Sequence, residues 1–541
     1  DRLDPENGGV IAFVSNGAWL DGNSTDGFRK ELENEFSSIY VFNLRGNQRT
    51  SGELSRKEGG KIFGSGSRTP ISITLLIKKP EHKGKANIYY HDIGDYLSQK
   101  EKLQIISDFK SIEKLPLKTL KPNAEADWIN KRNEIFDTFI AIEPEKKFNL
   151  KTQTFFNTYA VGIATNRDAW AYNFSEKQLE SNMTSMIAFY NQQTEDFHKA
   201  LQKDQNLLIK DFINDDVKKI KWTRALRRYA LLNNNFEFQK PEIVDGFYRP
   251  YCKQKLYFHK PFIESPGLSS QLFPNNKVEN FVISITGMGS SKDFSVQITN
   301  KVTDIQLIMN GQSFPLYYFE KREKIQGNLF DADSEDEYIR RDGVSDFILQ
   351  RAIKQFGKSV SKEDVFYYVY GILHSPDYKE AFANDLKKML PRIPLVDEPR
   401  EFWKFSKAGR GLADLHINYE TVESAKGVIV MYGKVPKESI EEAIDSNDLS
   451  NINYRVSKMK FLKKDRKDIK DTIIYNNQIT IENIPEEAYN YVVNGKSAIE
   501  WIIERYQVKT DSKSGIKNNP NDALLFNMTG GCYASQGKTD L

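Results

Sequence analysis

The chain has 541 residues, which is too long for one hydrophobic core, so two to four domains are expected. Its 77 basic and 74 acidic residues give a net charge of +3, which excludes a uniformly basic protein but allows a local basic face. The two cysteines, Cys252 and Cys532, exclude a disulfide framework and a cysteine zinc cluster, and they favour a cytoplasmic location. The apolar runs are too short for a membrane span, so no membrane partner is expected.

The first eighty residues have the pattern of an α/β sheet. Apolar runs at 10–14, 39–44 and 71–77 predict strands, and residues 24–36 predict a helix. A strand–helix–strand unit belongs in a sheet that helices cover on both faces. The chain therefore begins with what we interpret as the second half of such a sheet, and the cofactor-binding first half is expected upstream of Asp1.

The whole chain is predicted to divide into four parts, and the pattern is mixed from about residue 150 onward. The predicted parts are a sheet fragment over 1–95, a proline-containing connector over 96–150, an α+β domain over 151–515 and an atypical tail over 516–541. Helices are predicted at 97–106, 176–201, 345–356, 362–374, 378–390 and 498–506. Strands are predicted within 281–320 and 425–484, and a charged loop at 331–342.

A long loop over residues 45–70 combines cations with glycines. Its cations are Arg45, Arg49, Arg56, Lys57, Lys61 and Arg68. Glycine lets the backbone approach a phosphate closely, and the cations neutralise the phosphate charge. A mobile solvated loop is the alternative, although structureless loops of this length are uncommon in compact domains.

The segment Gly8–Lys79 resembles the late half of gamma-class adenine-N6 DNA methyltransferases. The resemblance includes the run Gly59-Gly60-Lys61-Ile62-Phe63-Gly64 before the last strand. It implies a Rossmann-like class I methyltransferase sheet in which Phe63 packs against an adenine that has left the duplex. The alternative is that Phe63 only fills the edge of the sheet.

Residues 160–420 resemble the C-terminal part of type ISP restriction-modification enzymes, and the likeness continues to about Lys513. The segments that carry it are Val161–Asp168, Tyr248–Gln254, Phe314–Tyr318, Arg341–Phe347 and Tyr367–Tyr378. The family joins nuclease, helicase-like ATPase, methyltransferase and target-recognition parts in one polypeptide. The resemblance implies double-stranded DNA as partner, S-adenosylmethionine as methyl donor, and ATP and Mg only in the upstream parts. This chain alone should then be inactive.

Nine cations are candidate DNA contacts under this resemblance. They are Arg45, Arg49, Arg56, Lys61, Arg68, Arg227, Arg228, Arg249 and Lys253. For residues 222–228, a helix with a solvated basic face is the more common explanation. His374 and His416 are too isolated to predict a metal site.

Two further strings resemble methyltransferase motifs. Ser375-Pro376-Asp377-Tyr378 lacks the second proline of the catalytic turn, and Thr286-Gly287-Met288-Gly289 is a weak glycine pattern that we interpret as a turn. The open alternatives are a stand-alone DNA-binding module without catalysis and a methyltransferase with permuted motifs that uses residues 286–289.

Overall fold

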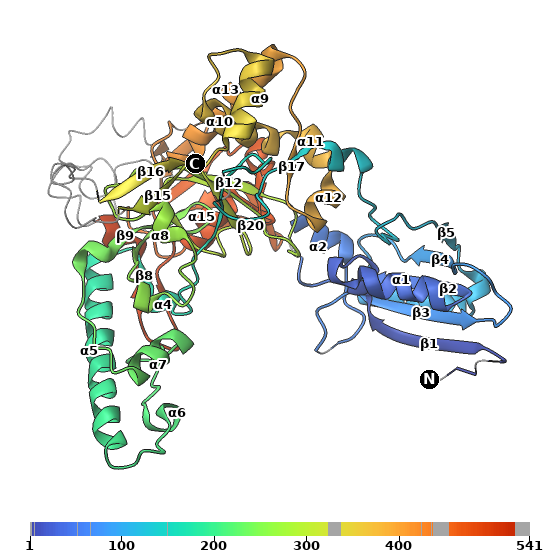
Figure 1. The fold of residues 1–541 in the computed structure, drawn as a ribbon, viewed down its shortest axis with the longest axis horizontal. Coiled ribbons are helices and arrows are strands. Elements are labelled where there is room, and N and C mark those ends of the chain that lie inside the picture. The colour runs from blue at the N-terminus through green and yellow to red at the C-terminus, as the bar shows by residue number, and fades with distance from the viewer. Residues whose placement is uncertain are drawn as a thin grey trace. The chain divides into compact units, whose positions relative to one another are not determined.

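The computed structural model describes residues 3–524 except 5, 51, 65, 149, 291, 323–336, 424, 434 and 437–453. The chain forms two compact units (Figure 1). Unit 1 comprises Asp1–Ala141, Gly287–Phe294 and Ser375–Pro394, and unit 2 comprises Ile142–Thr286, Ser295–His374 and Leu395–Leu541. The predicted boundary at residue 95 falls inside unit 1, because the segment up to residue 141 packs with the preceding sheet.

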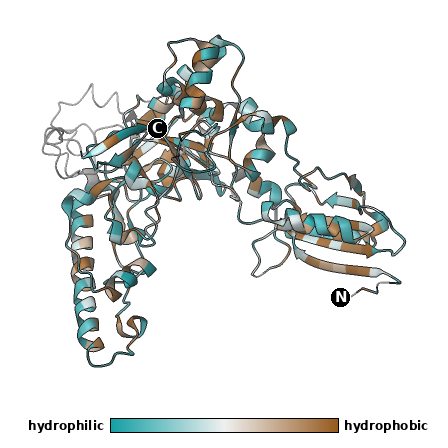
Figure 2. Cartoon of the chain, in the orientation of Figure 1, coloured by the Kyte–Doolittle hydropathy of each residue, from teal (hydrophilic) through white to brown (hydrophobic). Residues whose placement is uncertain are grey.

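Unit 1 contains a five-stranded mixed sheet in the order β1-β3-β2-β4-β5. Strand β3 runs antiparallel to both neighbours, whereas β2 and β4 are parallel. The bounds are β1 Gly9–Asn16, β2 Ser38–Arg45, β3 Ile71–Lys78, β4 Asn87–Asp92 and β5 Lys118–Leu120. The three predicted strands are confirmed, and the predicted helix is α1 (Asp26–Glu35). In Figure 2 the sheet strands carry hydrophobic colour along much of their length.

Two apolar clusters cover the two faces of this sheet. One joins Leu32 of α1 with Ile39, Val41, Leu76 and Ile88. The other joins Phe42 and Leu44 with Ile105, Ile106 and Phe109 of α3 (Gln99–Phe109). Alternation along β2 therefore sends successive side chains to opposite helices, as expected for a sheet between two helical layers. Ser98 and Glu101 form a capping box that fixes where α3 begins.

The segment Ser375–Pro394 packs on unit 1 although it lies far along the sequence. It forms α11 (Pro376–Ala381), α12 (Ala383–Lys388) and β17 (Arg392–Ile393), which pairs with β6 (Ile140–Ala141). Lys388 Nζ lies 3.0 Å from both Asp127 Oδ1 and Asp21 Oδ1. Burial alone would raise the pKa of Asp127, but hydrogen bonds from Arg132 and Lys388 outweigh it and lower that pKa. Removing Lys388 would leave a buried carboxylate short of a partner.

The Ser375–Tyr378 string has a structural role in this segment. The Ser375 side chain accepts a hydrogen bond from Tyr378 N and caps α11, with Pro376 in the first turn. The buried Tyr378 hydroxyl donates to the Arg392 carbonyl at 2.7 Å. The single helix predicted at 378–390 is therefore divided into α11 and α12, with Phe382 between them.

The described part of unit 2 contains three sheets of four or five strands. They have the orders β13-β9-β10-β8, β12-β11-β14-β7 and β19-β18-β22-β21-β20. The bounds in the first two are β7 Ala160–Val161, β8 Tyr172–Asn173, β9 Ile243–Arg249, β10 Cys252–Tyr257, β11 Val282–Ile285, β12 Val296–Thr299, β13 Val302–Thr303 and β14 Gln312–Pro315. Those in the third are β18 Ile429–Tyr432, β19 Val435–Pro436, β20 Lys460–Lys464, β21 Lys467–Ile474 and β22 Ile479–Glu482. The predicted mixed α+β composition is confirmed.

An arm of three helices extends from these sheets (Figure 1). It consists of α5 (Glu176–Leu201), α6 (Ile209–Phe212) and α7 (Arg224–Leu231). The helix predicted at 176–201 is thus confirmed with its bounds. Buried Met183, Met186, Ile187, Tyr190 and Phe197 recur on one side of α5 and form a core with Trp222 and Leu226.

Helices α10 (Lys362–His374) and α13 (Pro399–Ile417) pack closely in unit 2. A Cβ atom at Gly409 would overlap the Tyr367 carbonyl oxygen, and one at Gly371 would overlap that of Phe405. The two glycines therefore permit the close approach. The other α-helices in the described part of unit 2 are α4 Asp168–Ala171, α8 Ser269–Leu272, α9 Asp346–Phe356, α15 Ala498–Arg505 and α16 Pro520–Leu524.

Three two-stranded sheets also lie in the described part of unit 2, and two predictions are revised. The pairs are β15 Tyr317–Lys321 with β16 Tyr338–Asp342, β23 Val492–Val493 with β24 Lys496–Ser497, and β25 Lys509–Thr510 with β26 Lys517–Asn518. The loop predicted at 331–342 ends in strand β16, and its first part lies outside the described residues. The tail predicted from 516 begins in packed structure, since the Asn521 side chain donates to Val456 O at 2.7 Å. Residues 525–541 of that tail are not described.

Candidate nucleic-acid interface

The loop that follows β2 is held by backbone hydrogen bonds. It contains α2 (Gly52–Glu58), a helix that the sequence analysis did not predict. Gly46 N donates to Glu58 O at 3.1 Å, so the chain returns to the end of β2. The ammonium of the buried Lys102 on α3 donates to Leu44 O at 2.9 Å and to Glu58 O at 2.7 Å. The loop is thereby attached to the core of unit 1.

The Gly59–Gly60 pair brings the loop against the beginning of α3. Gly60 N donates to Leu97 O at 2.8 Å, and the Gln99 side chain donates to Ile62 O at 2.7 Å. Gly59 has φ +67°, and a Cβ atom there would overlap the Leu97 carbonyl. Both the positive φ and the short approach require glycine.

Phe63 follows this anchored segment and points out of the core. Ile62 is 8% exposed and packs with Phe42 and Leu44, whereas Phe63 is 49% exposed. Within the described residues, no aromatic ring contact of Phe63 occurs. Ile62 is therefore the residue that packs into this cluster, and the Phe63 ring remains half exposed.

The cations of this loop differ in availability. Arg45 contacts Asp92, with Nε 2.6 Å from Oδ1, and also Asp95. Arg68 is exposed and donates to Gln48 O at 3.0 Å. Arg49 and Arg56 are exposed, and Lys61 is half-buried. Arg45 thus has carboxylate partners within unit 1, which the sequence pattern did not indicate, and its assignment to DNA stays a prediction.

Two predicted contacts in unit 2 are also occupied internally. Arg249 is 14% exposed, lies 2.8 Å from Asp304 and 3.4 Å from Asp168, and stacks on Tyr248. Burial raises the pKa of Asp304 to about 6, although Arg249 acts in the opposite direction. Lys253 Nζ donates to Ile417 O and Glu420, both at 2.9 Å. Arg249 and Lys253 thus have carboxylate partners within unit 2, which the sequence pattern did not indicate, and their assignment to DNA stays a prediction.

Arg227 and Arg228 lie on α7, where they differ. Arg228 is exposed, whereas Arg227 is half-buried and its Nε has no hydrogen-bond partner among the described residues. Thr223 caps the helix through its hydroxyl. The structure thus places Arg228 on an open surface and Arg227 at its margin.

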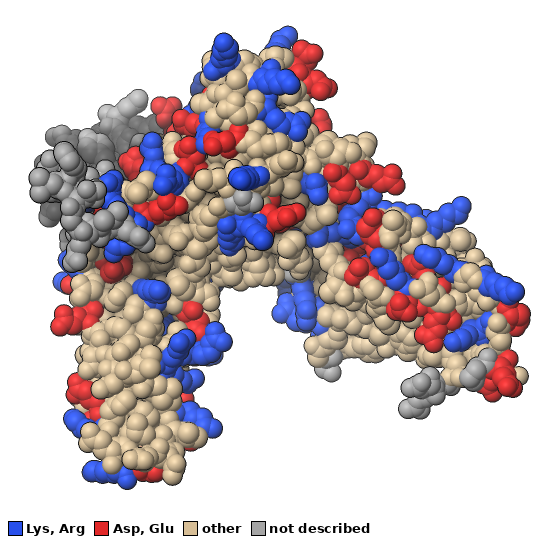
Figure 3. Space-filling model, viewed as in Figure 1, with Lys and Arg blue, Asp and Glu red and all other residues tan. Residues whose placement is uncertain are grey.

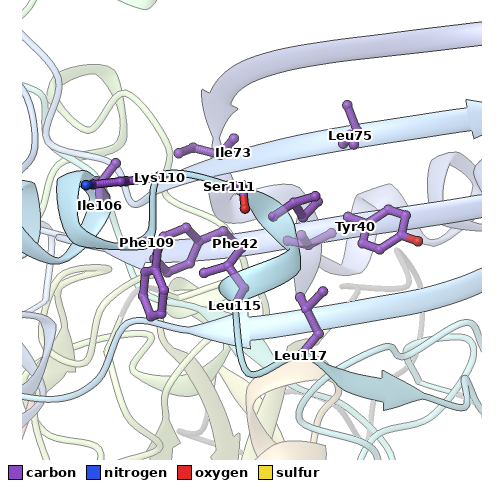
Figure 4. A pocket seen from close by; sticks show the side chains of 12 residues that line it. Tyr40, Phe42, Ile73, Leu75, Ile106, Phe109, Lys110, Ser111, Leu115 and Leu117 are labelled. Carbon is purple, nitrogen blue, oxygen red and sulfur yellow. The ribbon is translucent and has the colours of Figure 1, made fainter.

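Unit 1 also has an apolar cleft of about 270 Å³ on one sheet face (Figure 4). Tyr40, Phe42, Ile73 and Leu75 line it from β2 and β3, and Phe109 lines it from α3. Its other polar contributors are Lys110 and Ser111, and no carboxylate lines it. The cleft therefore suits hydrocarbon side chains rather than the charged and hydroxylated groups of S-adenosylmethionine.

The glycine string 286–289 connects two antiparallel strands. It follows β11, turns at Met288 and Gly289, and leads to β12, with which β11 pairs. A phosphate-binding glycine loop instead connects a strand to a helix N-terminus. The interpretation of this string as a turn is confirmed.

Residues 154–528 match the family model described as the type ISP C-terminal specificity domain. This match covers more than half of the chain. The chain belongs to the type ISP restriction-modification family. The type ISP resemblance read from the sequence is therefore confirmed, whereas none of the curated proteins matches the chain.

Three solved structures resemble the type ISP chain over almost its whole length. A nuclease-deletion mutant of the type ISP enzyme LlaGI, in complex with a DNA substrate mimic, is 39% identical with a TM-score of 0.78, and the match covers 96% of this chain and 44% of that chain. The ATP-dependent type ISP enzyme LlaBIII bound to DNA is 36% identical with a TM-score of 0.77, covering 96% and 31%. The DrdV–DNA complex is 27% identical with a TM-score of 0.75, covering 94% and 47%. This chain thus spans less than half the length of each.

In the described part of the chain, no helix combines the length and apolarity needed to cross a bilayer. Over the same residues, histidine, cysteine and acidic side chains do not gather in groups of three that could hold a metal ion.

Proposed function

We propose that this chain recognises a specific sequence in duplex DNA and that unit 1 supports a flipped adenine during N6 methylation. The methyl donor in this proposal is S-adenosylmethionine, bound by other segments of the same polypeptide together with the nuclease and helicase-like parts. Two observations support DNA as the partner: the specificity-domain match and the DNA present in all three similar structures. Residues of unit 2 would then read the sequence, and unit 1 would hold the target base.

Phe63 is the observation that carries the methylation part of the proposal. Its ring is half exposed, and its backbone is fixed through Gly60, Ile62 and α3. A base that leaves the duplex loses stacking, and an aromatic side chain restores about 1–3 kcal/mol of it. A ring on a fixed backbone provides this contact with little loss of conformational entropy.

The β1 edge of the unit 1 sheet favours the proposal that another segment of the polypeptide packs there. Strand β1 pairs only with β3 among the described strands, and its Val10 and Val14 are 58% and 54% exposed. An unpaired edge with exposed apolar side chains invites another strand and a covering layer. We therefore propose that another segment of the polypeptide extends this sheet at β1 and contributes the cofactor site.

The test is single-turnover methylation by the full-length enzyme with Phe63→Ala. We expect the rate to fall about 5- to 150-fold, which corresponds to the loss of about 1–3 kcal/mol of base stacking. Binding to cognate duplex should change little, because phosphate contacts dominate affinity. The matched control is Phe28→Ala, since Phe28 on α1 is 48% exposed in the same unit.

A base analogue at the target position gives a second measurement. Fluorescence of 2-aminopurine should rise on binding to the wild-type enzyme and rise less with Phe63→Ala. If Phe63→Ala methylates at the wild-type rate, Phe63 has no part in base support. Sequence recognition is tested separately: if the enzyme binds cognate and scrambled duplexes equally, that part of the proposal fails.

A further inference from the structure

A run of cations leads into α7 and continues along it. Residues 218–228 contain Lys218, Lys219, Lys221, Arg224, Arg227 and Arg228, and no acidic residue. We refer to these six residues as the basic ridge. In Figure 3, Lys and Arg side chains gather along the side of the arm that bears α7.

The ridge is open to solvent and only weakly neutralised. Lys218, Lys219, Lys221, Arg224 and Arg228 are exposed. In the described part of unit 2, the ridge forms an ion pair through Arg224, whose Nε lies 3.7 Å from Glu264 Oε1. The Arg224 side chain is 95% exposed. An exposed pair of this kind contributes little and is screened by salt. The charge therefore remains available to an external anion.

Core packing and hydrogen bonds hold the beginning of α7 in place. Leu226 and Ala230 lie in the core of the arm, and the Thr223 hydroxyl accepts from Leu226 N. The buried Arg167 donates to that hydroxyl at 2.7 Å. The carboxylate of Glu264 accepts from Ala225 N at 3.0 Å, which stabilises the beginning of α7. A fixed basic helix binds an anionic surface without first having to fold.

The ridge consists of lysine and arginine, which neutralise phosphate charge. Arg224 and Arg228 are four residues apart and share a helical face, and Lys221 lies three residues before Arg224, outside the helix. Phosphate contacts fix position on the duplex without specifying its sequence.

We infer that the basic ridge binds the phosphate backbone of duplex DNA beside the recognised sequence. The arm carries the ridge away from the sheets of unit 2, as Figure 1 shows, and α5 alone is about 39 Å long at 1.5 Å per residue. A duplex held at the body of the unit would extend along such an arm. The inference rests on the proposed recognition of DNA by this chain.

The test uses the full-length enzyme with Lys221→Gln, Arg224→Gln and Arg228→Gln combined. Binding is measured by fluorescence anisotropy across a salt series with two cognate duplexes, one short and one with about one and a half helical turns added on each side. The wild-type enzyme should bind the longer duplex more tightly. The triple variant should lose that gain, and its salt slope on the longer duplex should fall by up to about 2.7, or about 0.9 for each lost phosphate contact.

A matched control removes the same charge elsewhere in unit 2. Lys464, Arg466 and Lys467 are exposed in the β20–β21 hairpin, and their replacement by Gln should preserve the gain from the longer duplex. Circular dichroism melting should show both triple variants folded. If the control variant loses the gain from the longer duplex equally, the effect comes from general electrostatics. The inference that the ridge binds DNA locally is then wrong.

The remaining outcomes separate the two proposals. If the wild-type enzyme prefers the cognate sequence but gains nothing from the added duplex, the ridge inference fails and the proposed function stands. If the triple variant changes which sequence is preferred, the ridge reads bases and the inference is also wrong. If the wild-type enzyme shows no preference for the cognate sequence, the proposed function itself fails.

Discussion

The basic ridge of α7 and the cations between Tyr248 and Lys253 belong to the same unit, but they have different surroundings. Arg249 lies against Asp304 and Asp168, and Lys253 lies against Glu420. Arg228 is exposed on the outer side of α7. The comparison shows that the cations of one unit differ in how closely folding brings carboxylates to them. Acidic partners distant in sequence decide this, and the local run of basic residues does not.

Replacing Arg249 is expected to change the free energy of unfolding much more than replacing a cation of the basic ridge. Arg249→Met should lower the free energy of unfolding at pH 7 by about 3–5 kcal/mol, because the buried Asp304 carboxylate loses its cation. The matched change Arg228→Met should alter it by no more than about 0.5 kcal/mol. Urea unfolding of both variants measures the difference. Equal small effects would show that Arg249 is no more structural than the ridge.

The pH dependence of stability tests the same ion pair. The pKa of Asp304 is about 6 in the folded chain against an ordinary 3.8, so the folded chain binds the additional proton between these values. The contribution of Asp304 to the free energy of unfolding should therefore fall by about 3 kcal/mol as the pH rises from about 4 to about 6, and then remain level.

The variant Asp304→Asn isolates this contribution, since the difference between its urea-unfolding curve and that of the wild type removes the other titrating groups. Asp245→Asn is the control, because the pKa of Asp245 is lowered despite burial by its bonds with Lys255 and Lys301. If the free energy of unfolding of Asp304→Asn has the same pH dependence as that of the wild type, Asp304 is not the source of that dependence.

The smallest effect concerns one loop cation of unit 1. Among the described residues Lys61 has no ion pair, and it precedes the Ile62–Phe63 step. Lys61→Gln should leave stability unchanged and reduce the log–log salt slope of DNA binding by about 0.9, the loss of one phosphate contact. A stability loss at constant salt slope would instead place Lys61 with Arg45 among the internally engaged cations.

Local patterns predicted the elements whose cause is local. Helices α5 and α10 follow from apolar spacing, and strands β1, β2 and β3 follow from apolar runs between turns. The sequence also identified the Phe63 loop, although it did not reveal α2 or the attachment through Lys102. The buried ammonium that holds the loop is an ordinary helix residue in the sequence, so no local signal marked it.

Long-range pairing explains the remaining differences. Asp304 lies 55 residues beyond Arg249, and Asp385 accepts from the backbone of Asn133, 252 residues earlier. Such partners leave no periodicity and no motif at either end. For the same reason the assignment of Ser375–Pro394 to unit 1 was absent from the predicted domain boundaries.

The attachment of Lys388 to Asp127 and Asp21 matters for the engineering of type ISP chimaeras. A specificity exchange between relatives at a single junction could use the one after Ala141, where the first segment of unit 1 ends. That design would bring residue 388 from the donor while keeping the two aspartates of the recipient. A graft that retains Ser375–Pro394 with the recipient, and exchanges only the flanking stretches, keeps cation and carboxylates from one parent.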